Sequence, residues 1–376
     1  MNMSTMNSML AAGAVLFALA TVGAAQVQSL SRLSCPGSNG SPEERMQHEK
    51  ILENAILADF AYLGPGEATL NLQEECPNGV SSPDEDRTAI LIHRIPDSII
   101  DEANEVYGGE REGDYIICPS IGTRDERVAA AYEFAEVNGR LSLLIRTAIK
   151  YAAADLDTEE LAVLRLKNAD GDEVLGVRGT EFWRPDQWNG SVSGLIGTSC
   201  PFDISVEIAK SFFNLETLKS VYEEIGLGSV NVGRFGAVGH SLGGAVVQHV
   251  TVSEGFRDAL TILERDISQS SLIRDEFDFR AYSYNSLGVR EEKVPKRPID
   301  DLTSVRVAGE VLEQIEADLE GEYARRQIGQ IYRYSTDSIS RIEPEGIEFH
   351  RMKAAKRAIC QCLDGTSNTF EAEFQN

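Results

Sequence analysis

The chain has 376 residues, of which 42% are hydrophobic, so it can bury a substantial core. Its 60 acidic residues outnumber its 35 basic residues and give a formal net charge of -25. Because this charge repels phosphate groups at long range, we discount nucleic acid as a partner, and neither disorder nor a fibrous repeat fits the composition.

The N-terminal segment has the composition of a signal peptide. Residues 1–25 contain no charged side chain, and the stretch 10–25 is apolar and rich in small residues up to the polar Gln26. A retained membrane anchor is the competing interpretation. The apolar run is shorter than the roughly 20 residues that span a bilayer, which favours the signal peptide. We therefore expect a secreted protein, extracellular or periplasmic.

The cysteines agree with an oxidising compartment, because all follow the proposed cleavage point and their number is even. They are Cys35, Cys76, Cys118, Cys200, Cys360 and Cys362. Cys360 and Cys362 lie on a predicted helix where their side chains point apart, so each pairs elsewhere or stays reduced. Neither a paired CxxC nor an HExxH motif occurs in the sequence, so we expect no metal site.

The first predicted helix begins with a capping pattern, in which Ser41 is the N-cap, Pro42 follows and Glu44 reaches back. It should run to about Leu63 and lay an apolar face on the main domain. The stretch 64–124 is rich in Gly, Pro and Asp, and the sequence does not order it. Residues 26–125 are thus expected to form a helical and loop-rich N-terminal extension packed on the core.

Further along, short apolar runs alternate with helical patterns, which favours a mostly parallel sheet flanked by helices in an α/β fold. An Ala-rich stretch at 126–154 reads as helical, and a hairpin with Asp170-Gly171 at its tip joins two strands. The remaining predicted strands are 234–238, 279–284 and 328–334, and the remaining helices are 204–225, 242–252 and a charged helix around 305–325.

The strand and helix on either side of Gly239-His240-Ser241-Leu242-Gly243 give this pentapeptide the context of a nucleophile elbow. In such a turn, glycines allow strand and helix to pack closely, and the serine is pushed into the open above the sheet. A Gly-rich turn with an idle serine is the alternative. We expect Ser241 to be a catalytic nucleophile.

A serine hydroxyl needs a histidine to accept its proton and an acid to orient that histidine. In α/β-hydrolases the chain order is Ser, acid, His, and only His249 and His350 follow the serine. His249 lies about two turns into the helix that leaves the elbow, so His350 is the expected base. For the acid we choose Asp337, which follows the strand 328–334, over Asp300 and Asp301, whose charged, Pro-rich setting suits an exposed loop.

An oxyanion needs two fixed donors, and the residue after the nucleophile supplies one, here the backbone N–H of Leu242. Val177-Arg178-Gly179-Thr180-Glu181 ends a strand in a tight turn. Thr180 can therefore offer the second N–H, supported by its hydroxyl.

The pair of motifs, strand-Arg-Gly-Thr followed by strand-Gly-His-Ser-Leu-Gly-Gly-Ala, resembles the signature of class 3 lipases over residues 160–350. Further similar segments are Phe60-Ala61-Tyr62, Gln187-Trp188-Asn189, Tyr284-Asn285-Ser286 and Tyr334-Ser335-Thr336-Asp337. The resemblance implies an α/β-hydrolase domain over residues 126–376. It also implies hydrolysis of triacylglycerol, phospholipid or other carboxylic esters through an acyl-enzyme, without a cofactor and with transient contact to a lipid interface.

Two features depart from that family: the interval from Asp337 to His350 is short, and the N-terminal region has no counterpart. Residues 182–203 mix apolar and flexible positions, which fits a lid, an acyl-binding wall or an ordinary packed connection. A short-chain carboxylesterase, a peptidase, or a catalytically silent binding protein with the same fold remain alternatives.

Overall fold

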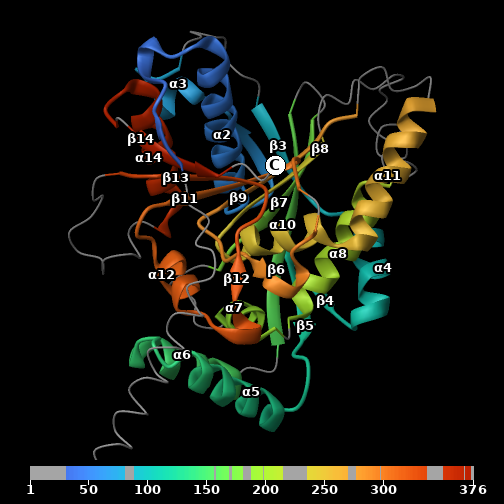
Figure 1. Cartoon of the computed structure of the whole chain (residues 1–376). Helices are drawn as coiled ribbons and strands as arrows, with labels where there is room; N and C mark the ends of the chain where they lie inside the picture. Colours follow the sequence, from blue (N-terminus) through green and yellow to red (C-terminus); the bar gives the residue numbers. More distant parts are fainter. Residues whose placement is uncertain are drawn as a thin grey trace, which may run out of the picture.

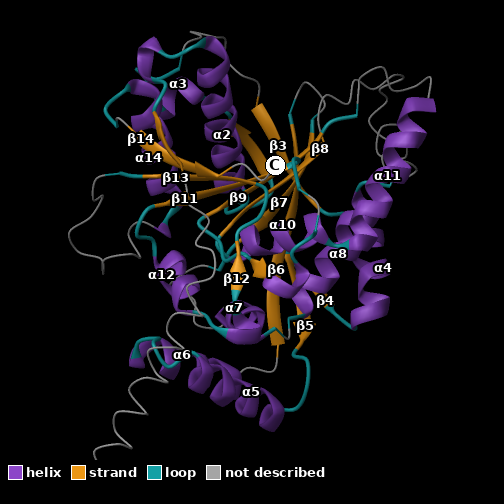
Figure 2. Ribbon diagram, in the orientation of Figure 1, coloured by secondary structure: helices purple, strands orange, loops and turns teal. Residues whose placement is uncertain are grey.

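One large sheet runs through the middle of the molecule, with helices on both faces (Figure 1 and Figure 2). This mixed α/β arrangement confirms the predicted fold class at that level. The computed structural model describes residues 31–80, 89–155, 158–168, 172–180, 188–197, 199–214, 235–269, 277–296, 298–336, 350–367 and 369–373. The expected signal peptide, the Asp170-Gly171 tip and Asp337 lie outside these residues.

The centre of the sheet is parallel. Its five strands, in spatial order, are β7 (Glu173–Arg178), β8 (Phe235–His240), β9 (Phe279–Tyr284), β11 (Leu302–Val307) and β13 (Gln330–Tyr334). Neighbouring parallel strands need a crossover connection, and several of these connections contain helices. Between β8 and β9 lie α10 (Leu242–Val252) and α11 (Glu254–Gln269), and α12 (Val311–Asp318) lies between β11 and β13.

Antiparallel strands extend the sheet on both sides. Beyond β7 follow β6 (Thr158–Lys167), β3 (Ala89–Arg94) and β2 (Gly66–Thr69), and β6 also pairs β5 (Tyr115–Pro119), which pairs β4 (Glu110–Glu112). Beyond β13 follow β14 (Thr369–Glu373) and β1 (Ser31–Ser34), and β10 (Val289–Arg290) with β12 (Arg325–Arg326) forms a separate ribbon. The N-terminal segment thus contributes strands to the sheet, whereas the sequence suggested an extension packed on it.

Helices cover both faces of the sheet because successive side chains of a strand point to opposite faces. On β8, Ala237 joins the cluster under α4 (Asp97–Tyr107), α8 (Cys200–Phe212), α10 and α11. Its neighbour Val238 joins the cluster under α2 (Pro42–Phe60), α3 (Leu72–Glu75) and α14 (Met352–Asp364). A third apolar cluster unites α5 (Arg124–Val137), α6 (Leu143–Asp155) and α7 (Trp188–Ile196).

Several predicted elements are confirmed by the structure. The capping box of α2 is complete, since the Ser41 hydroxyl accepts from the Glu44 N–H at 3.2 Å and Glu44 accepts from the Ser41 N–H at 3.1 Å. The hairpin formed by β6 and β7 is antiparallel. Strand β9 and helix α10 have the predicted bounds.

The predicted charged helix at 305–325 is wrong. Residues Leu302–Val307 form the fully buried strand β11 between β9 and β13, and only Val311–Asp318 is helical. The charged residues of the helix dominate the pattern over this stretch. The preceding run, which is rich in β-branched residues, forms a strand because it is buried on both faces of the sheet. The predicted helix at 126–154 is two helices, α5 and α6, because a turn at Asn138–Ser142 separates them.

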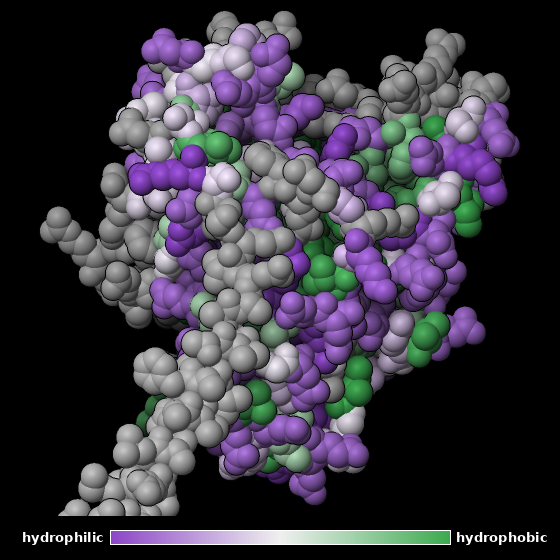
Figure 3. All heavy atoms as spheres, in the orientation of Figure 1, coloured by the Kyte–Doolittle hydropathy of each residue, from purple (hydrophilic) through white to green (hydrophobic). Residues whose placement is uncertain are grey.

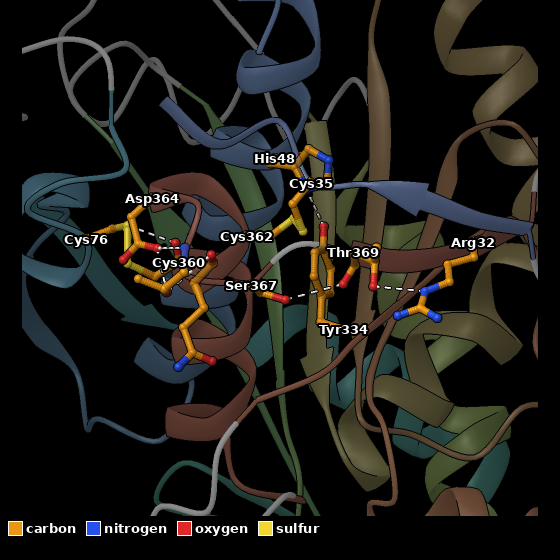
Figure 4. The surroundings of a disulfide bond; sticks show 12 residues. Arg32, Cys35, His48, Cys76, Tyr334, Cys360, Cys362, Asp364, Ser367 and Thr369 are labelled. Atoms are coloured by element: carbon orange, nitrogen blue, oxygen red, sulfur yellow. Dashed lines mark hydrogen bonds between the residues drawn. A yellow bond between two sulfur atoms is a disulfide. The ribbon is translucent and has the colours of Figure 1, made fainter. Parts of the chain in front are cut away.

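Three disulfides pair all six cysteines: Cys35–Cys362, Cys76–Cys360 and Cys118–Cys200. Figure 4 shows the first two, which tie helix α14 near the C-terminus to two segments near the N-terminus. Cys360 and Cys362 therefore pair with different partners, as their opposed directions on a helix require. Within the described ranges, no helix has the length and apolarity needed to cross a membrane.

Candidate active site

Ser241 stands at a strained turn between β8 and α10. Its backbone has φ 57° and ψ -124°, and residues other than glycine rarely adopt a positive φ. A Cβ on Gly243 would lie 2.1 Å from the carbonyl oxygen of Val177, and one on Gly239 would lie 2.4 Å from the backbone of Gly243. Only glycines allow strand and helix to approach this closely, so the turn has the geometry that the pentapeptide predicted.

His350 lies beside the serine. Its Nε2 is 2.8 Å from Ser241 Oγ, although the two residues are 109 positions apart. The other ring nitrogen, Nδ1, is 2.9 Å from a carboxylate oxygen of Glu310. Nδ1–H therefore donates to Glu310, and Nε2 is left to accept the serine proton. The structure thus brings together the predicted serine and histidine.

The carboxylate that contacts Nδ1 of His350 is Glu310. The expected acid, Asp337, lies outside the described residues. The Glu310 side chain is fully buried and is the N-cap of α12, where it accepts from the N–H of Leu312 at 2.8 Å and from that of Glu313 at 2.7 Å. These donors and the helix N-terminus stabilise its negative charge. An imidazole Nδ1 carries a single hydrogen, and here that hydrogen is donated to Glu310. Glu310 therefore makes the contact that the sequence predicts for Asp337.

The rival acids lie elsewhere. Asp301 forms an ion pair with Arg257 and immediately precedes β11, so it is at the amino end of the strand, away from the elbow. Glu310 follows the carboxyl end of the same strand and keeps the order serine, acid, histidine. His249, the rival base, faces Asp203 at 3.4 Å from its position on α10.

The turn before the predicted oxyanion donor Thr180 runs very close to the elbow. A Cβ on Gly179 would lie 2.3 Å from the carbonyl oxygen of His240 and 2.9 Å from the Ser241 Cβ. The hydroxyls of Thr180 and Ser191 are hydrogen-bonded, which links this turn to α7. Leu242, the other predicted donor, is the first residue of α10, where a backbone N–H has no partner within the helix.

His240 is part of the site, although its place in the pentapeptide predicts no role for it. Its Nε2 donates to the backbone carbonyl of His350 at 2.6 Å, so its Nδ1 accepts from the Tyr62 hydroxyl at 2.7 Å. Asn285 also donates to the His350 carbonyl, at 2.9 Å. Burial lowers the pKa of His240 to about 3, with the nearby His350 adding to the shift, and therefore His240 is neutral at ordinary pH. These contacts hold the backbone of His350 in place.

The segment proposed as a lid or wall forms a packed helix where the structure describes it. Leu195 and Ile196 of α7 are buried in the third apolar cluster. Arg290 donates to the carbonyl of Ile196 at 2.9 Å, and Arg325 donates to the carbonyls of Gly194 and Leu195 at the end of the same helix. In this structure α7 is therefore packed in place beside the turn at Gly179-Thr180, and residues 182–187 lie outside the described part.

Among the described residues, no group of three or more His, Cys, Asp or Glu side chains is arranged to hold a metal ion. Comparison with known proteins gave no match, either to a protein-family model or to a curated protein sequence. The resemblance to class 3 lipases therefore rests on the Arg178-Gly179-Thr180 turn and the elbow at Ser241.

Proposed function

We propose that the chain is a secreted serine hydrolase of the α/β-hydrolase fold that cleaves carboxylic esters, with Ser241 as nucleophile, His350 as general base and Glu310 as the orienting acid. The observation that carries the proposal is the continuous chain of contacts from Ser241 Oγ to His350 Nε2 at 2.8 Å and from His350 Nδ1 to Glu310 at 2.9 Å. Such a chain is what converts a poor hydroxyl nucleophile into an effective one.

The reaction follows from these positions. His350 Nε2 takes the proton of Ser241 as Oγ attacks the ester carbonyl carbon, and the backbone N–H groups of Leu242 and Thr180 stabilise the resulting oxyanion. The intermediate collapses to an acyl-serine, and the alcohol leaves with the proton from His350. Water, deprotonated by His350, then attacks the acyl-serine, and the carboxylic acid is released as His350 returns this proton to Ser241 Oγ. Throughout, the buried Glu310 stabilises the imidazolium form of His350.

Lipid esters are the proposed substrate class because the Arg178-Gly179-Thr180 turn and the Gly-His-Ser-Leu-Gly-Gly-Ala elbow resemble those of class 3 lipases. Secretion is proposed from the composition of residues 1–25. The pairing of all six cysteines supports it, because disulfides persist in oxidising compartments.

A fluorophosphonate probe and a series of p-nitrophenyl esters test the proposal. The native chain should be labelled and should hydrolyse these esters, whereas Ser241→Ala should lose both properties with its fold intact by circular dichroism. Turnover that persists with long acyl chains supports lipid esters, and turnover of short chains alone indicates a carboxylesterase. A native protein that the probe does not label would refute the enzyme proposal.

A further inference from the structure

The hairpin of α5 and α6 carries much of the apolar surface that the protein exposes. Ten large apolar side chains are exposed among the described residues; four of them lie on α5 or α6, and a fifth, Ile121, lies just before α5. They are Ile121 at 45%, Tyr132 at 51%, Val137 at 40%, Leu143 at 73% and Tyr151 at 69% exposure. Figure 1 shows α5 and α6 side by side at the lower end of the view, and Figure 3 shows green apolar surface between purple polar surface there.

On α6 the exposed residues share one side of the helix. Leu143, Thr147 and Tyr151 recur at intervals of four, so they form a stripe, and the neighbouring Ala148 is exposed as well. The opposite side of α6, including Ile149 and Ala152, is buried in the third apolar cluster. Helix α6 is therefore apolar on its buried side and along much of its exposed side, which is unusual for a helix at a water-facing surface.

Two basic residues of α6, Arg146 and Lys150, lie three positions after Leu143 and Thr147 of this stripe, whereas Arg140 precedes the helix and is ion-paired with Glu320. Residues 139–154 contain Arg140, Arg146 and Lys150 and no acidic residue. The Lys150 ammonium lies 4.1 Å from the centre of the Tyr132 ring on α5, which joins the exposed sides of the two helices. Aromatic rings and long basic side chains at the edge of an apolar surface suit a lipid–water boundary, where each has an apolar body and a polar end.

The charge of the hairpin differs from that of the whole chain. Residues 124–155 contain five basic and five acidic residues, whereas the chain has a formal net charge of -25. At physiological salt, charges more than about 8 Å from a surface are largely screened. The hairpin can therefore approach a lipid headgroup layer without the repulsion that the rest of the protein would cause.

The hairpin is also connected to the candidate site. Helix α6 packs on α7 through Ile149 and Ala152, which share a cluster with Val192 and Leu195. Ser191, which directly precedes Val192 in α7, is hydrogen-bonded to Thr180, the proposed oxyanion donor. Only helix α7 therefore lies between α6 and the turn at Thr180 along this chain of contacts.

From these observations we infer that the exposed side of the α5–α6 hairpin, centred on Leu143 and Tyr151, is a docking surface for a lipid–water interface. The choice of lipid as the occupant rests on the proposed ester hydrolase function. Docking there brings the substrate layer to the side of the molecule where α7 borders the oxyanion turn.

Binding to phosphatidylcholine vesicles tests the inference without catalysis, in a chain that carries Ser241→Ala. This protein should co-sediment with the vesicles, and adding Leu143→Ser and Tyr151→Ser should weaken binding at least about tenfold, since two apolar side chains no longer enter the lipid. The matched control is Ile262→Ser, because Ile262 is 50% exposed on α11, outside the hairpin. The control should bind like the parent.

In the active chain, the same double variant should lower hydrolysis of a long-chain ester presented in vesicles by a similar factor. Its turnover of soluble p-nitrophenyl acetate should be unchanged, which shows that the site is intact. Equal vesicle binding by the parent and the double variant would overturn the inference, as would no binding by the parent. So would a dimer in sedimentation analysis that the double variant abolishes, because the stripe would then be a contact between copies.

The outcomes separate this inference from the proposed function. Vesicle binding that depends on Leu143 and Tyr151 in a chain whose serine no probe labels would retain the docking surface and reject the hydrolase. Labelling of Ser241 without vesicle binding would do the reverse.

Discussion

Replacing Glu310 by Gln tests the part of the site on which sequence and structure differ. One carboxylate oxygen accepts from the N–H of Glu313, and the other accepts from both the N–H of Leu312 and Nδ1–H of His350. A Gln side chain has one oxygen, so its NH₂ must face a donor on one side. If NH₂ faces His350, Nδ1 must accept, the proton moves to Nε2, and Nε2 no longer accepts from Ser241.

The magnitude follows from this loss of the active tautomer. Replacement of the triad Asp by Asn in a serine protease, a known reference case, lowers kcat by about 10⁴, which corresponds to roughly 5.5 kcal/mol in the barrier. We expect Glu310→Gln to lower kcat for p-nitrophenyl butyrate by about 10³ to 10⁴. Weaker capping of α12 should cost about 1 kcal/mol of stability, so the variant should remain folded in a thermal melt.

The matched control is Asp337→Asn, which should keep kcat within about twofold of the parent if Glu310 alone orients His350. Both variants are measured by steady-state kinetics beside the native chain. If Asp337→Asn causes the large loss and Glu310→Gln keeps more than about a tenth of the native rate, Glu310 is not the orienting acid.

Three further predictions concern other contacts. Tyr62→Phe removes the donor to Nδ1 of His240 and should lower kcat about tenfold with KM unchanged, measured by steady-state kinetics; an unchanged kcat would show that His240 is held without it. Replacing Cys35 and Cys362 together by Ser should lower the free energy of unfolding in urea by about 2–4 kcal/mol, and no change would contradict a stabilising disulfide. Burial raises the pKa of Glu159 from 4.5 to about 7, so the folded state binds more protons than the unfolded state between these values, and stability should decline as pH rises through this window. Glu159→Gln should flatten that decline in thermal melts at different pH, and equal slopes would refute it.

The tight turn that carries Ser241 could be predicted from sequence because its geometry is local. The turn at Ser241 depends on glycines two residues away on either side, and these are visible in the pentapeptide. His350 followed from elimination among five histidines, which needed only the chain order of the residues. In the structure, Nε2 of His350 lies 2.8 Å from Oγ of Ser241.

The acid could not be predicted in the same way. Its position depends on which strand lies next to β9 in the sheet, and the sequence pattern predicts part of that strand, β11, as a charged helix. Once β11 is placed, Glu310 follows its carboxyl end and caps α12. A carboxylate that caps a helix looks the same in sequence whether or not a histidine lies beside it.

The same limit applies to the supports of the site. Tyr62 and His240 are 178 positions apart, and Cys76 and Cys360 are 284 apart, so no local pattern pairs them. By itself, the sequence determined the elbow, the histidine and the alternation of strands and helices, because these depend on residue type over a few positions. Only the tertiary structure decided the acid, the residues that hold the His350 backbone and the disulfide pairs, because these depend on how strands and helices distant in sequence pack together.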